Sequence, residues 1–413
     1  MIANIPGFHY SGMAGFEEIP SMSTIKELQQ HGQSVWIDYI QRSLMTTGKL
    51  GELIRDDGIR GLTSNPSIFA KAIAESGEYD AALSACASSG KETKAIYESL
   101  AIADIQMAAD VLRPVYDDTK GRDGLVSLEV SPEWSRDTQG TIEEARRLWS
   151  GVCRDNLMIK VPGTPEGIVA MEALTAEGIN VNVTLLFDVS VYASVAAAYI
   201  RALSKRMAMG LSIDRIASVA SFFVSRVDSA VDTILSQRIN TTTSGDVRTL
   251  EGLLGKAAIA NSKLAYAQYL ATFKGVTWDS LAEKGARTQR LLWASTGTKN
   301  PNYLDVMYVE ELVGPDTVST IPPATLAAFR HHGRPRSSLA TGLDSARAVM
   351  AELAEYGVSM PRVTHDLLCD GEKQFADAFR RLLGSVAEAT TTSFKQHDSR
   401  GAASTSASTE KCS

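Results

Sequence analysis

From about Thr24 onward, the sequence repeats one pattern: a short apolar run that ends in a polar residue, then a longer segment with helical spacing of apolar residues. Strands that alternate with helices in this way form a parallel sheet, because each pair of parallel strands needs a crossover connection. Eight runs are predicted to be strands: Val35 to Asp38, Ile59 to Thr63, Leu125 to Glu129, Leu157 to Lys160, Val181 to Leu186, Ile216 to Ala220, Leu291 to Ala294 and Thr317 to Thr320. Eight such units can close into a (β/α)8 TIM barrel, which is the α/β fold that we predict.

An open, doubly wound sheet is the main structural alternative. Sheets of that kind often bind nucleotides through a glycine-rich loop after the first strand. The sequence contains neither a G-x-G-x-x-G motif at that point nor a Walker phosphate loop anywhere. These two absences weaken a nucleotide-binding reading and leave the barrel as the favoured architecture.

Three sites between the predicted strands resemble helix starts. Thr141 is followed three residues later by Glu144, the pattern of a capping box. Thr164 precedes Pro165, a residue that suits the first helical position. Asp188 precedes a segment with an apolar face at helical spacing. We expect a helix to begin at each of these points.

Two long segments, Asn65 to Gly121 and Val227 to Arg287, exceed the minimal unit of one strand and one helix. We interpret them as helical elaborations of the barrel rather than as separate domains. Within the second, Ile239 to Val247 contains three successive threonines and is expected to be a loop. After the eighth strand, Leu343 to Tyr356 and Val363 to Leu383 form two amphipathic helices that can pack across a face of the barrel.

The patterns divide the chain into three parts. Residues 1–23 are an N-terminal lead, residues 24–389 are the barrel with its C-terminal helices, and residues 390–413 are a tail. Eleven of the tail residues are Ser or Thr, and Phe394 is the only large apolar one. Because this composition cannot bury a core, we expect a disordered Ser/Thr-rich tail.

The charge balance limits the kinds of partner. Lys and Arg total 41 against 48 for Asp and Glu, so the net charge is -7. A nucleic-acid binder or an anionic-membrane binder would show a basic excess, so we expect neither nucleic acid nor membrane as a partner. A single phosphate needs only one or two local cations. The apolar faces of the predicted helices could form a homodimer interface as well as contacts within the chain, so a homodimer stays a possible state.

Cysteine spacing and the N-terminal composition favour a cytoplasmic protein without a metal. The four cysteines lie far apart, without a C-x-x-C pair or zinc-ligand spacing: Cys86, Cys153, Cys369 and Cys412. The first 25 residues contain Glu17 and Glu18 but no Lys or Arg, which argues against a secretory or transit peptide. No run approaches the roughly 18 apolar residues that a membrane helix requires.

In a barrel of this kind, the reacting groups project from the carboxyl ends of the strands. Asp38, Glu129 and Lys160 close three of the predicted strands. Other polar or aromatic residues lie at or just after strand ends: Asn65, Asn182, Thr184, Ser221, Phe223 and Arg226. Two cations, two carboxylates, two amides and two hydroxyls are thus expected to converge on one mouth.

Lys160 is the most unusual of these residues, because Leu157, Met158 and Ile159 make its strand apolar. Burial and a neighbouring cation both favour a neutral amine, which can attack a ketone and form a Schiff base. The alternative is that Lys160 has no catalytic role and is a solvated lysine at the end of a strand. A Schiff-base route also needs proton transfers, which Glu129 and Asp38 can supply; alternatively, these two are ion-paired carboxylates at the rim. Asn65 and Asn182 could equally serve as a helix cap and a strand-end hydrogen-bonding group.

Six ordered motifs resemble those of the transaldolase family, in the form that looks like its larger bacterial and plant-type branch. The resemblance covers about Thr24 to Leu383. The motifs are Gly-Leu-Thr-Ser-Asn-Pro at 61–66, Val-Ser-Leu-Glu-Val at 126–130, Ile-Lys-Val-Pro at 159–162, Asn-Val-Thr-Leu-Leu-Phe at 182–187, Ala-Ser-Phe-Phe-Val-Ser-Arg at 220–226 and Ala-Ser-Thr-Gly-Thr-Lys-Asn-Pro at 294–301. The family consists of class I Schiff-base barrels with the lysine on the fourth strand, where our count places Lys160.

The resemblance implies roles for individual residues. Lys160 matches the Schiff-base lysine, Glu129 the acid/base that acts through a water also held by Thr184, and Asp38 the group that takes the C4 hydroxyl proton. Further matches concern the substrate: Asn65, Asn182 and Ser221 hold dihydroxyacetone hydroxyls, Phe223 lines the site, and Arg226 binds phosphate. Lys299 is proposed as the partner of Arg226, with a surface charge as its alternative.

The resemblance implies a cofactor-free transaldolase of the pentose phosphate pathway, which acts on sugar phosphates. It would transfer dihydroxyacetone from sedoheptulose 7-phosphate to glyceraldehyde 3-phosphate, giving erythrose 4-phosphate and fructose 6-phosphate. The first alternative is a fructose 6-phosphate aldolase-like enzyme that releases free dihydroxyacetone. The second is a glycosidase that uses Asp38 and Glu129 as its carboxylate pair, and the third is a binding protein whose barrel has lost its catalytic activity. A glycosidase would leave Lys160 unexplained.

Overall fold

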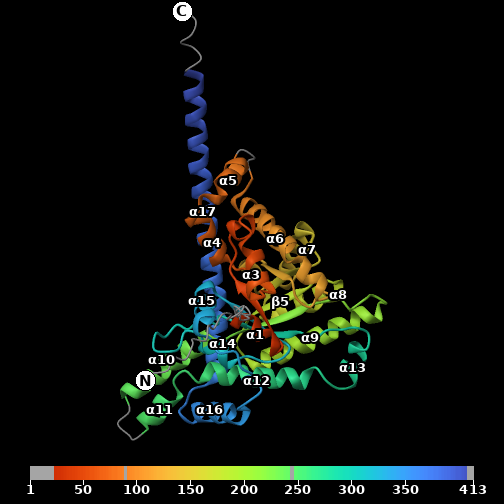
Figure 1. Ribbon diagram of the computed structural model, residues 1–413, viewed down its shortest axis with the longest axis vertical. Coiled ribbons are helices and arrows are strands. Elements are labelled where there is room, and N and C mark those ends of the chain that lie inside the picture. The colour runs from red at the N-terminus through yellow and green to blue at the C-terminus, as the bar shows by residue number, and fades with distance from the viewer. Residues whose placement is uncertain (1–22, 88–90, 242–245, 407–413) are drawn as a thin grey trace, which may run out of the picture.

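The computed structural model, drawn in Figure 1, describes residues 23–87, 91–241 and 246–406. Within these residues, eight parallel strands close into a barrel in sequence order. The strands are β1 (Gln33–Asp38), β2 (Gly61–Thr63), β3 (Leu125–Glu129), β4 (Leu157–Pro162), β5 (Val181–Leu186), β6 (Ser218–Phe223), β7 (Arg290–Ala294) and β8 (Thr317–Ile321). Strand β8 closes the barrel by pairing with β1, from Gln33 opposite Thr317 to Ile37 opposite Ile321. The predicted (β/α)8 TIM barrel is confirmed.

Helices surround the barrel and account for the long segments between strands. They are α1 (Thr24–Gln30), α2 (Arg42–Thr46), α3 (Lys49–Asp57), α4 (Pro66–Glu75), α5 (Asp80–Ala87), α6 (Thr93–Asp118), α7 (Thr138–Val152), α8 (Pro165–Glu177), α9 (Val189–Ala208), α10 (Ser225–Thr241), α11 (Val247–Leu253), α12 (Ala257–Thr272), α13 (Val276–Ala282), α14 (Met307–Glu311), α15 (Pro323–His332), α16 (Leu343–Glu355) and α17 (Met360–Ser406). Strands β4, β5 and β6 are buried along their whole length, as expected where helices cover a sheet whose other face fills the barrel.

The sixth strand begins later than predicted. We expected Ile216 to Ala220, but β6 spans Ser218–Phe223 because its ladder with β7 runs from Val219 opposite Arg290 to Phe223 opposite Ala294. Apolar character alone could not show where this pairing starts. The correction places Ser221 and Phe223 inside the strand rather than after it.

Two of the three predicted helix starts are confirmed. The Thr164 hydroxyl accepts a hydrogen bond from Gly167 N at the start of α8, and the Asp188 carboxylate accepts from the first turn of α9. The capping box at Thr141 is wrong, because α7 begins three residues earlier with Asp137 as its cap. Glu144 instead accepts a hydrogen bond from the backbone N–H of Ser131 at 3.0 Å.

The expected loop from Ile239 to Val247 is shorter than predicted, because α10 continues to Thr241 and α11 begins at Val247. At the C-terminus, α17 runs beside α4 and α5 and continues well beyond the barrel (Figure 1). Its backbone is helical to Ser406, so it passes through most of the Ser/Thr-rich segment. The lead, apart from Ser23, and the last residues of the tail lie outside the described residues, so the expected disorder at the end of the tail stays a prediction.

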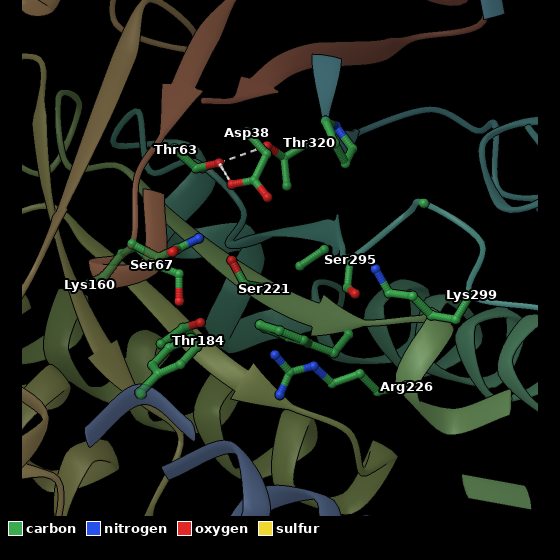
Figure 2. A pocket seen from close by; sticks show the side chains of 16 residues that line it. Asp38, Thr63, Ser67, Lys160, Thr184, Ser221, Arg226, Ser295, Lys299 and Thr320 are labelled. Carbon is green, nitrogen blue, oxygen red and sulfur yellow. Dashed lines mark hydrogen bonds between the residues drawn. The ribbon is translucent and has the colours of Figure 1, made fainter. Parts of the chain in front are cut away.

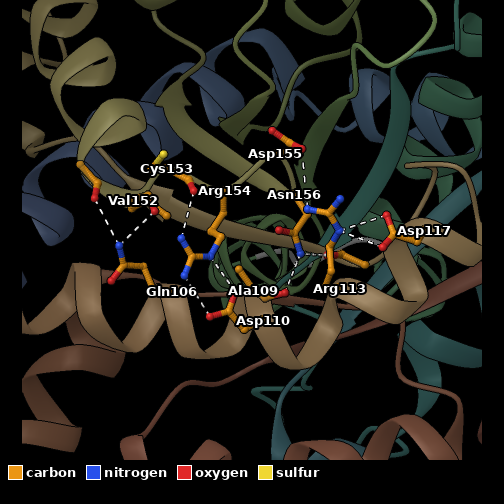
Figure 3. Close-up of polar contacts among 12 residues, drawn as sticks. Gln106, Ala109, Asp110, Arg113, Asp117, Val152, Cys153, Arg154, Asp155 and Asn156 are labelled. Carbon is orange, nitrogen blue, oxygen red and sulfur yellow. Dashed lines mark hydrogen bonds and ion pairs between the residues drawn. The ribbon is translucent and has the colours of Figure 1, made fainter.

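Helix α6 is fixed to the segment that leads into β4 by several polar contacts (Figure 3). The side-chain amide of Asn156 donates to the carbonyl oxygen of Ala109 at 2.8 Å. Arg154 Nε lies 2.6 Å from a carboxylate oxygen of Asp110. These contacts hold the amino-terminal end of β4, the strand that carries Lys160.

A buried ion pair closes the opposite end of the barrel from the carboxyl ends of the strands. Arg290 Nη2 lies 2.9 Å from Asp123 Oδ1, and both side chains are only 5% exposed. Asp123 also accepts hydrogen bonds from Ser34 and Trp36 on β1. Because the carboxylate is satisfied on several sides, the pair can sit in the interior at this point.

Candidate active site

A cavity of about 220 Å³ lies at the carboxyl ends of the barrel strands (Figure 2). Most of the predicted site residues line it: Asp38, Asn65, Lys160, Thr184, Ser221, Phe223, Arg226 and Lys299. The view shows Lys160 at one side of the cavity and the cationic ends of Arg226 and Lys299 at the other. The two predicted residues that do not line this cavity, Glu129 and Asn182, lie directly beside it on β3 and β5.

Lys160 projects from the fully buried strand β4 and is 6% exposed. Its amine donates a hydrogen bond to the carbonyl oxygen of Ser64 at 3.0 Å. The amine also lies 3.7 Å from Glu129 Oε2 and 6.0 Å from the ring centre of Phe375. A lysine amine with an apolar ring on one side and a carboxyl group on another is suited to act as a nucleophile toward a carbonyl.

Glu129 stands beside Lys160 because the two residues pair in register on β3 and β4. Burial raises the pKa of Glu129 from 4.5 to about 7, with Lys160 opposing the shift and the charge of Asp38 adding to it. Its Oε2 atom is buried and makes no hydrogen bond to any described residue. A carboxyl group with a pKa near 7 can both give and take a proton at neutral pH.

Thr184 offers a second buried polar atom without a partner. Its hydroxyl makes no hydrogen bond within the described part of the chain, and the residue is 1% exposed. Thr184 lies in a bulge of β5 between Val183 and Leu186, where Leu185 adopts a left-handed φ of 60°. Glu129 on β3 and Thr184 on β5 flank β4, the strand that carries Lys160. Hydroxyl and carboxyl oxygens without partners are the kind of groups that hold a water molecule, as the expected Glu129–water–Thr184 arrangement requires.

Asp38 ends β1 and accepts a hydrogen bond from the Thr63 hydroxyl at 2.8 Å. Thr63 in turn lies 2.7 Å from the hydroxyl of Thr320 on β8, and Figure 2 shows this chain of contacts. Burial raises the pKa of Asp38 above its ordinary value, against the opposing effects of Lys160, Thr63 and Lys299. The carboxyl group is therefore held in a fixed orientation at the rim with an increased proton affinity.

The two asparagines have different positions. Asn65 caps α4 by accepting a hydrogen bond from Ile68 N at 3.1 Å, as the capping alternative expected, and it also lines the cavity. Asn182 is fully buried below the cavity. There its amide donates to the Ser127 hydroxyl and accepts from Ser221 at 2.6 Å. In this state Asn182 orients Ser221, and its direct contact with substrate stays a prediction.

Arg226 lies in the first turn of α10, with its guanidinium carbon 5.4 Å from the ring centre of Phe223. Its Nη1 atom is buried and has no hydrogen-bond partner among the described residues. Burial lowers the pKa of Arg226, and the charge of Asp370 on α17 opposes that shift. A half-buried guanidinium that lines a cavity and keeps an unused donor is well suited to bind a phosphate.

Lys299 lies in the loop after β7 and is exposed. It lines the cavity and also a neighbouring polar groove of about 440 Å³ between α10 and the segment after β7. The structure therefore brings Lys299 to the same side of the mouth as Arg226 (Figure 2). This position is compatible with the expected pair of phosphate-binding cations.

Sequence reasoning missed several residues that line the cavity: Ser67, Ser295, Thr320 and Phe375. Ser295 follows β7 directly and has a left-handed φ of 57°, with its hydroxyl 2.9 Å from that of Ser225. Its place after a strand was a usable signal. Phe375 comes from α17, and no local pattern shows that this face of the helix covers the mouth.

Two further features bear on what this chain can bind. The described residues contain no group of three or more His, Cys, Asp or Glu side chains arranged to hold a metal ion. Among the same residues, every helix is too short or too polar to cross a membrane.

The fold and the cavity together define a class, the (β/α)8-barrel enzymes with a buried amine and two carboxyl groups at the mouth. Comparison with known proteins then identifies the family. The profile of the Transaldolase/Fructose-6-phosphate aldolase family matches residues 35–386, so the chain belongs to this family.

Individual relatives agree over nearly their whole length. The chain is 46% identical to the transaldolase of Trichodesmium erythraeum over 365 residues, which are 88% of this chain and 96% of that protein. It is 48% identical to the transaldolase of Thiobacillus denitrificans over 365 residues, 88% of this chain and all of that protein. Identity to transaldolase 2 of a Nostoc species is 46% over 372 residues, 89% of this chain and 97% of that protein.

Proposed function

We propose that this chain is a transaldolase, an enzyme of the transferase class that acts through a Schiff base on Lys160. It moves a dihydroxyacetone unit from sedoheptulose 7-phosphate to glyceraldehyde 3-phosphate, giving erythrose 4-phosphate and fructose 6-phosphate in the pentose phosphate pathway. Family membership and the relatives named transaldolase support this function. The observation that carries the mechanism is the buried Lys160 amine, 3.7 Å from a carboxyl oxygen of Glu129 at the barrel mouth.

In the first half of the reaction, the neutral Lys160 amine attacks the C2 carbonyl of the donor ketose and forms a carbinolamine. Glu129, in its protonated form, gives a proton to the departing hydroxyl, and loss of water leaves the iminium. Asp38, as a carboxylate, then takes the proton of the C4 hydroxyl. The C3–C4 bond breaks, its electron pair moves to the iminium to give an enamine, and the aldehyde product leaves.

In the second half, the enamine carbon attacks the aldehyde of glyceraldehyde 3-phosphate. Asp38 returns its proton to the new alkoxide, and water assisted by Glu129 and Thr184 hydrolyses the iminium to release fructose 6-phosphate. Ser221, Asn65 and Asn182 are proposed to hold the hydroxyls of the three-carbon unit. No step requires a metal ion or an organic cofactor.

Arg226 and Lys299 are proposed to bind the phosphate at the far end of the substrate. The unused, buried Nη1 donor of Arg226 and the shared side of the cavity support this assignment. The chain has a net charge of -7. Arg226 and Lys299 therefore form a small positive region that attracts an anionic substrate to an otherwise acidic protein.

A fructose 6-phosphate aldolase is the second candidate, because the matching family includes that activity in its description. The two candidates differ in the fate of the enamine, which attacks an aldehyde in one and is protonated in the other. Product analysis with fructose 6-phosphate, with and without erythrose 4-phosphate, separates them. A transaldolase forms sedoheptulose 7-phosphate only when the acceptor is present, whereas equal release of free dihydroxyacetone in both reactions would favour the aldolase.

We also infer a cytoplasmic location, which is supported by the free thiols of Cys153 and Cys369 among the described residues. A homodimer is compatible with the exposed helical faces. Measurement of the molar mass in solution tests that proposal directly.

A further inference from the structure

Two tyrosines from the segment after β7 donate hydrogen bonds to two aspartates on α10. Tyr303 lies 2.7 Å from Asp232 Oδ2, and Tyr308 lies 2.8 Å from Asp228 Oδ2. The aspartates are four residues apart, so they lie on one face of the helix about one turn from each other. The segment after β7 is thereby attached to α10 at two successive turns.

These two elements carry the two proposed phosphate-binding cations. Arg226 is the second residue of α10, only two positions before Asp228. Lys299 lies in the loop after β7, four residues before Tyr303. The tyrosine–aspartate bonds therefore connect the backbone that bears one cation to the backbone that bears the other.

The aspartates are also tied to a third element. Asp228 accepts a hydrogen bond from Ala258 N at 2.7 Å and Asp232 accepts from Gly255 N at 2.9 Å, both in the connection around the start of α12. A Cβ atom on Gly255 would lie only 2.7 Å from a ring atom of Tyr303, so the ring packs directly on this backbone. Each carboxylate thus holds a tyrosine against a support that is independent of the loop.

The arrangement is buried at the Tyr308–Asp228 pair and open to solvent next to Lys299. Asp228 and Tyr308 are each about 1% exposed, whereas Lys299 is exposed and borders both the cavity and the neighbouring groove. A lysine side chain has high rotamer freedom, so its preference for the cavity depends on where its backbone is held. If the loop were loose, the amine could also turn toward the groove that Asp228 and Asp232 line.

We propose that the Tyr303–Asp232 and Tyr308–Asp228 bonds are positioning contacts that hold Lys299 on the same side of the mouth as Arg226 and so determine the preference for phosphorylated substrates. The proposal rests on the proposed function, because it assigns phosphate binding to these cations. Neither tyrosine is a catalytic residue, since each acts through Lys299.

The test uses the Tyr303→Phe and Tyr308→Phe variants of the full chain, with fructose 6-phosphate and unphosphorylated fructose as donors and erythrose 4-phosphate as the acceptor. Each variant is expected to raise KM for fructose 6-phosphate about five- to tenfold with kcat little changed, because a lost hydrogen bond shifts an equilibrium by about that factor. The KM for fructose should stay the same. Equal changes for both donors would indicate general disruption and overturn the proposal.

Tyr79→Phe is the matched control, because Tyr79 also donates to a buried aspartate, Asp104, at 2.7 Å. Asp104 lies on α6, and neither Tyr79 nor Asp104 lines the cavity. The control loses a similar bond and should leave both KM values unchanged. A change in its KM for fructose 6-phosphate as large as in the test variants would contradict a specific role.

A double-mutant cycle distinguishes action through Lys299 from any other cause. In the Lys299→Ala background, Tyr303→Phe should have no further effect on KM for fructose 6-phosphate. An undiminished effect there would overturn the proposal even if the single variants behaved as expected. Inactivity of the wild-type chain toward both donors would instead refute the proposed function, so the two failures are distinguishable.

Discussion

Lys160 Nζ lies 3.7 Å from Glu129 Oε2, and the two residues face each other in register on adjacent strands of the barrel. The strand register fixes their backbones, so neither side chain depends on a loop for its place. Burial raises the pKa of Glu129 to about 7, although the nearby amine opposes that shift. A carboxyl group with this pKa beside the amine can give and take a proton at neutral pH, as loss of water from the carbinolamine and hydrolysis of the iminium require.

Replacing Glu129 with Gln should lower kcat by about 10²- to 10⁴-fold, the usual range for a positioned acid or base. Because Glu129 acts as the acid when the carbinolamine loses water, its protonated form is the active one. For wild type, kcat/KM should therefore fall as the pH rises through about 7. Measuring kcat/KM against pH for wild type and for the Gln variant checks this. If kcat/KM of the Gln variant falls over the same pH range, a group other than Glu129 causes the fall.

Replacing Arg226 with Met should raise KM for fructose 6-phosphate about 10- to 100-fold, as expected for the loss of a charge-assisted hydrogen bond. The wild-type side chain has a buried donor without a partner. The variant should therefore melt at the same temperature as wild type, or slightly higher, in the absence of substrate. Steady-state kinetics and thermal melts test both parts, and a large drop in melting temperature would argue for a structural role.

Replacing Phe375 with Ala should increase release of free dihydroxyacetone relative to transfer. The ring lines the cavity and its centre lies 6.0 Å from the Lys160 amine, so its removal admits water that can protonate the enamine. Phe375→Leu keeps an apolar cover and should behave like wild type. The ratio of the two products at a fixed acceptor concentration is the readout, and an unchanged ratio in the Ala variant would refute this role.

Replacing Asp123 with Asn should lower the free energy of unfolding by about 3 to 5 kcal/mol, because Arg290 would keep a buried charge without its partner. Burial tends to raise the pKa of Asp123, but Arg290 and the hydrogen bonds from Ser34 and Trp36 outweigh it and lower that pKa below 3.8. A lowered pKa contributes stability above the unfolded-state value, and this is lost as the pH falls. Urea denaturation should show a constant difference from wild type between pH 5 and 7 that shrinks below about pH 4; a constant difference throughout would contradict the assignment.

The parts of the structure that follow from local sequence were predictable. Alternating apolar and helical segments indicated the barrel, and the caps at Thr164 and Asp188 depend only on neighbouring residues. Thr141 and Glu144 matched a capping pattern but lie inside α7, because Asp137 caps that helix first. The start of β6 depends on pairing with β7, which no local pattern contains.

The same distinction holds for the site. Residues at strand ends converge because barrel geometry brings them together, and this could be argued from the sequence. The place of Phe375 depends on how α17 crosses the mouth, where Gly371 allows close approach to Leu185. The contact between Thr63 and Thr320 depends on closure of the barrel between residues 257 positions apart. Long-range packing of this kind could not be predicted from spacing.

The central claim is that Lys160 forms the Schiff base, and borohydride trapping tests it most directly. The protein is incubated with fructose 6-phosphate, reduced, digested with trypsin and analysed by mass spectrometry. We predict a single three-carbon adduct on Lys160, with loss of tryptic cleavage at that residue, and no adduct in the Lys160→Met variant. An adduct on another lysine, or none in the active wild-type protein, would contradict the account.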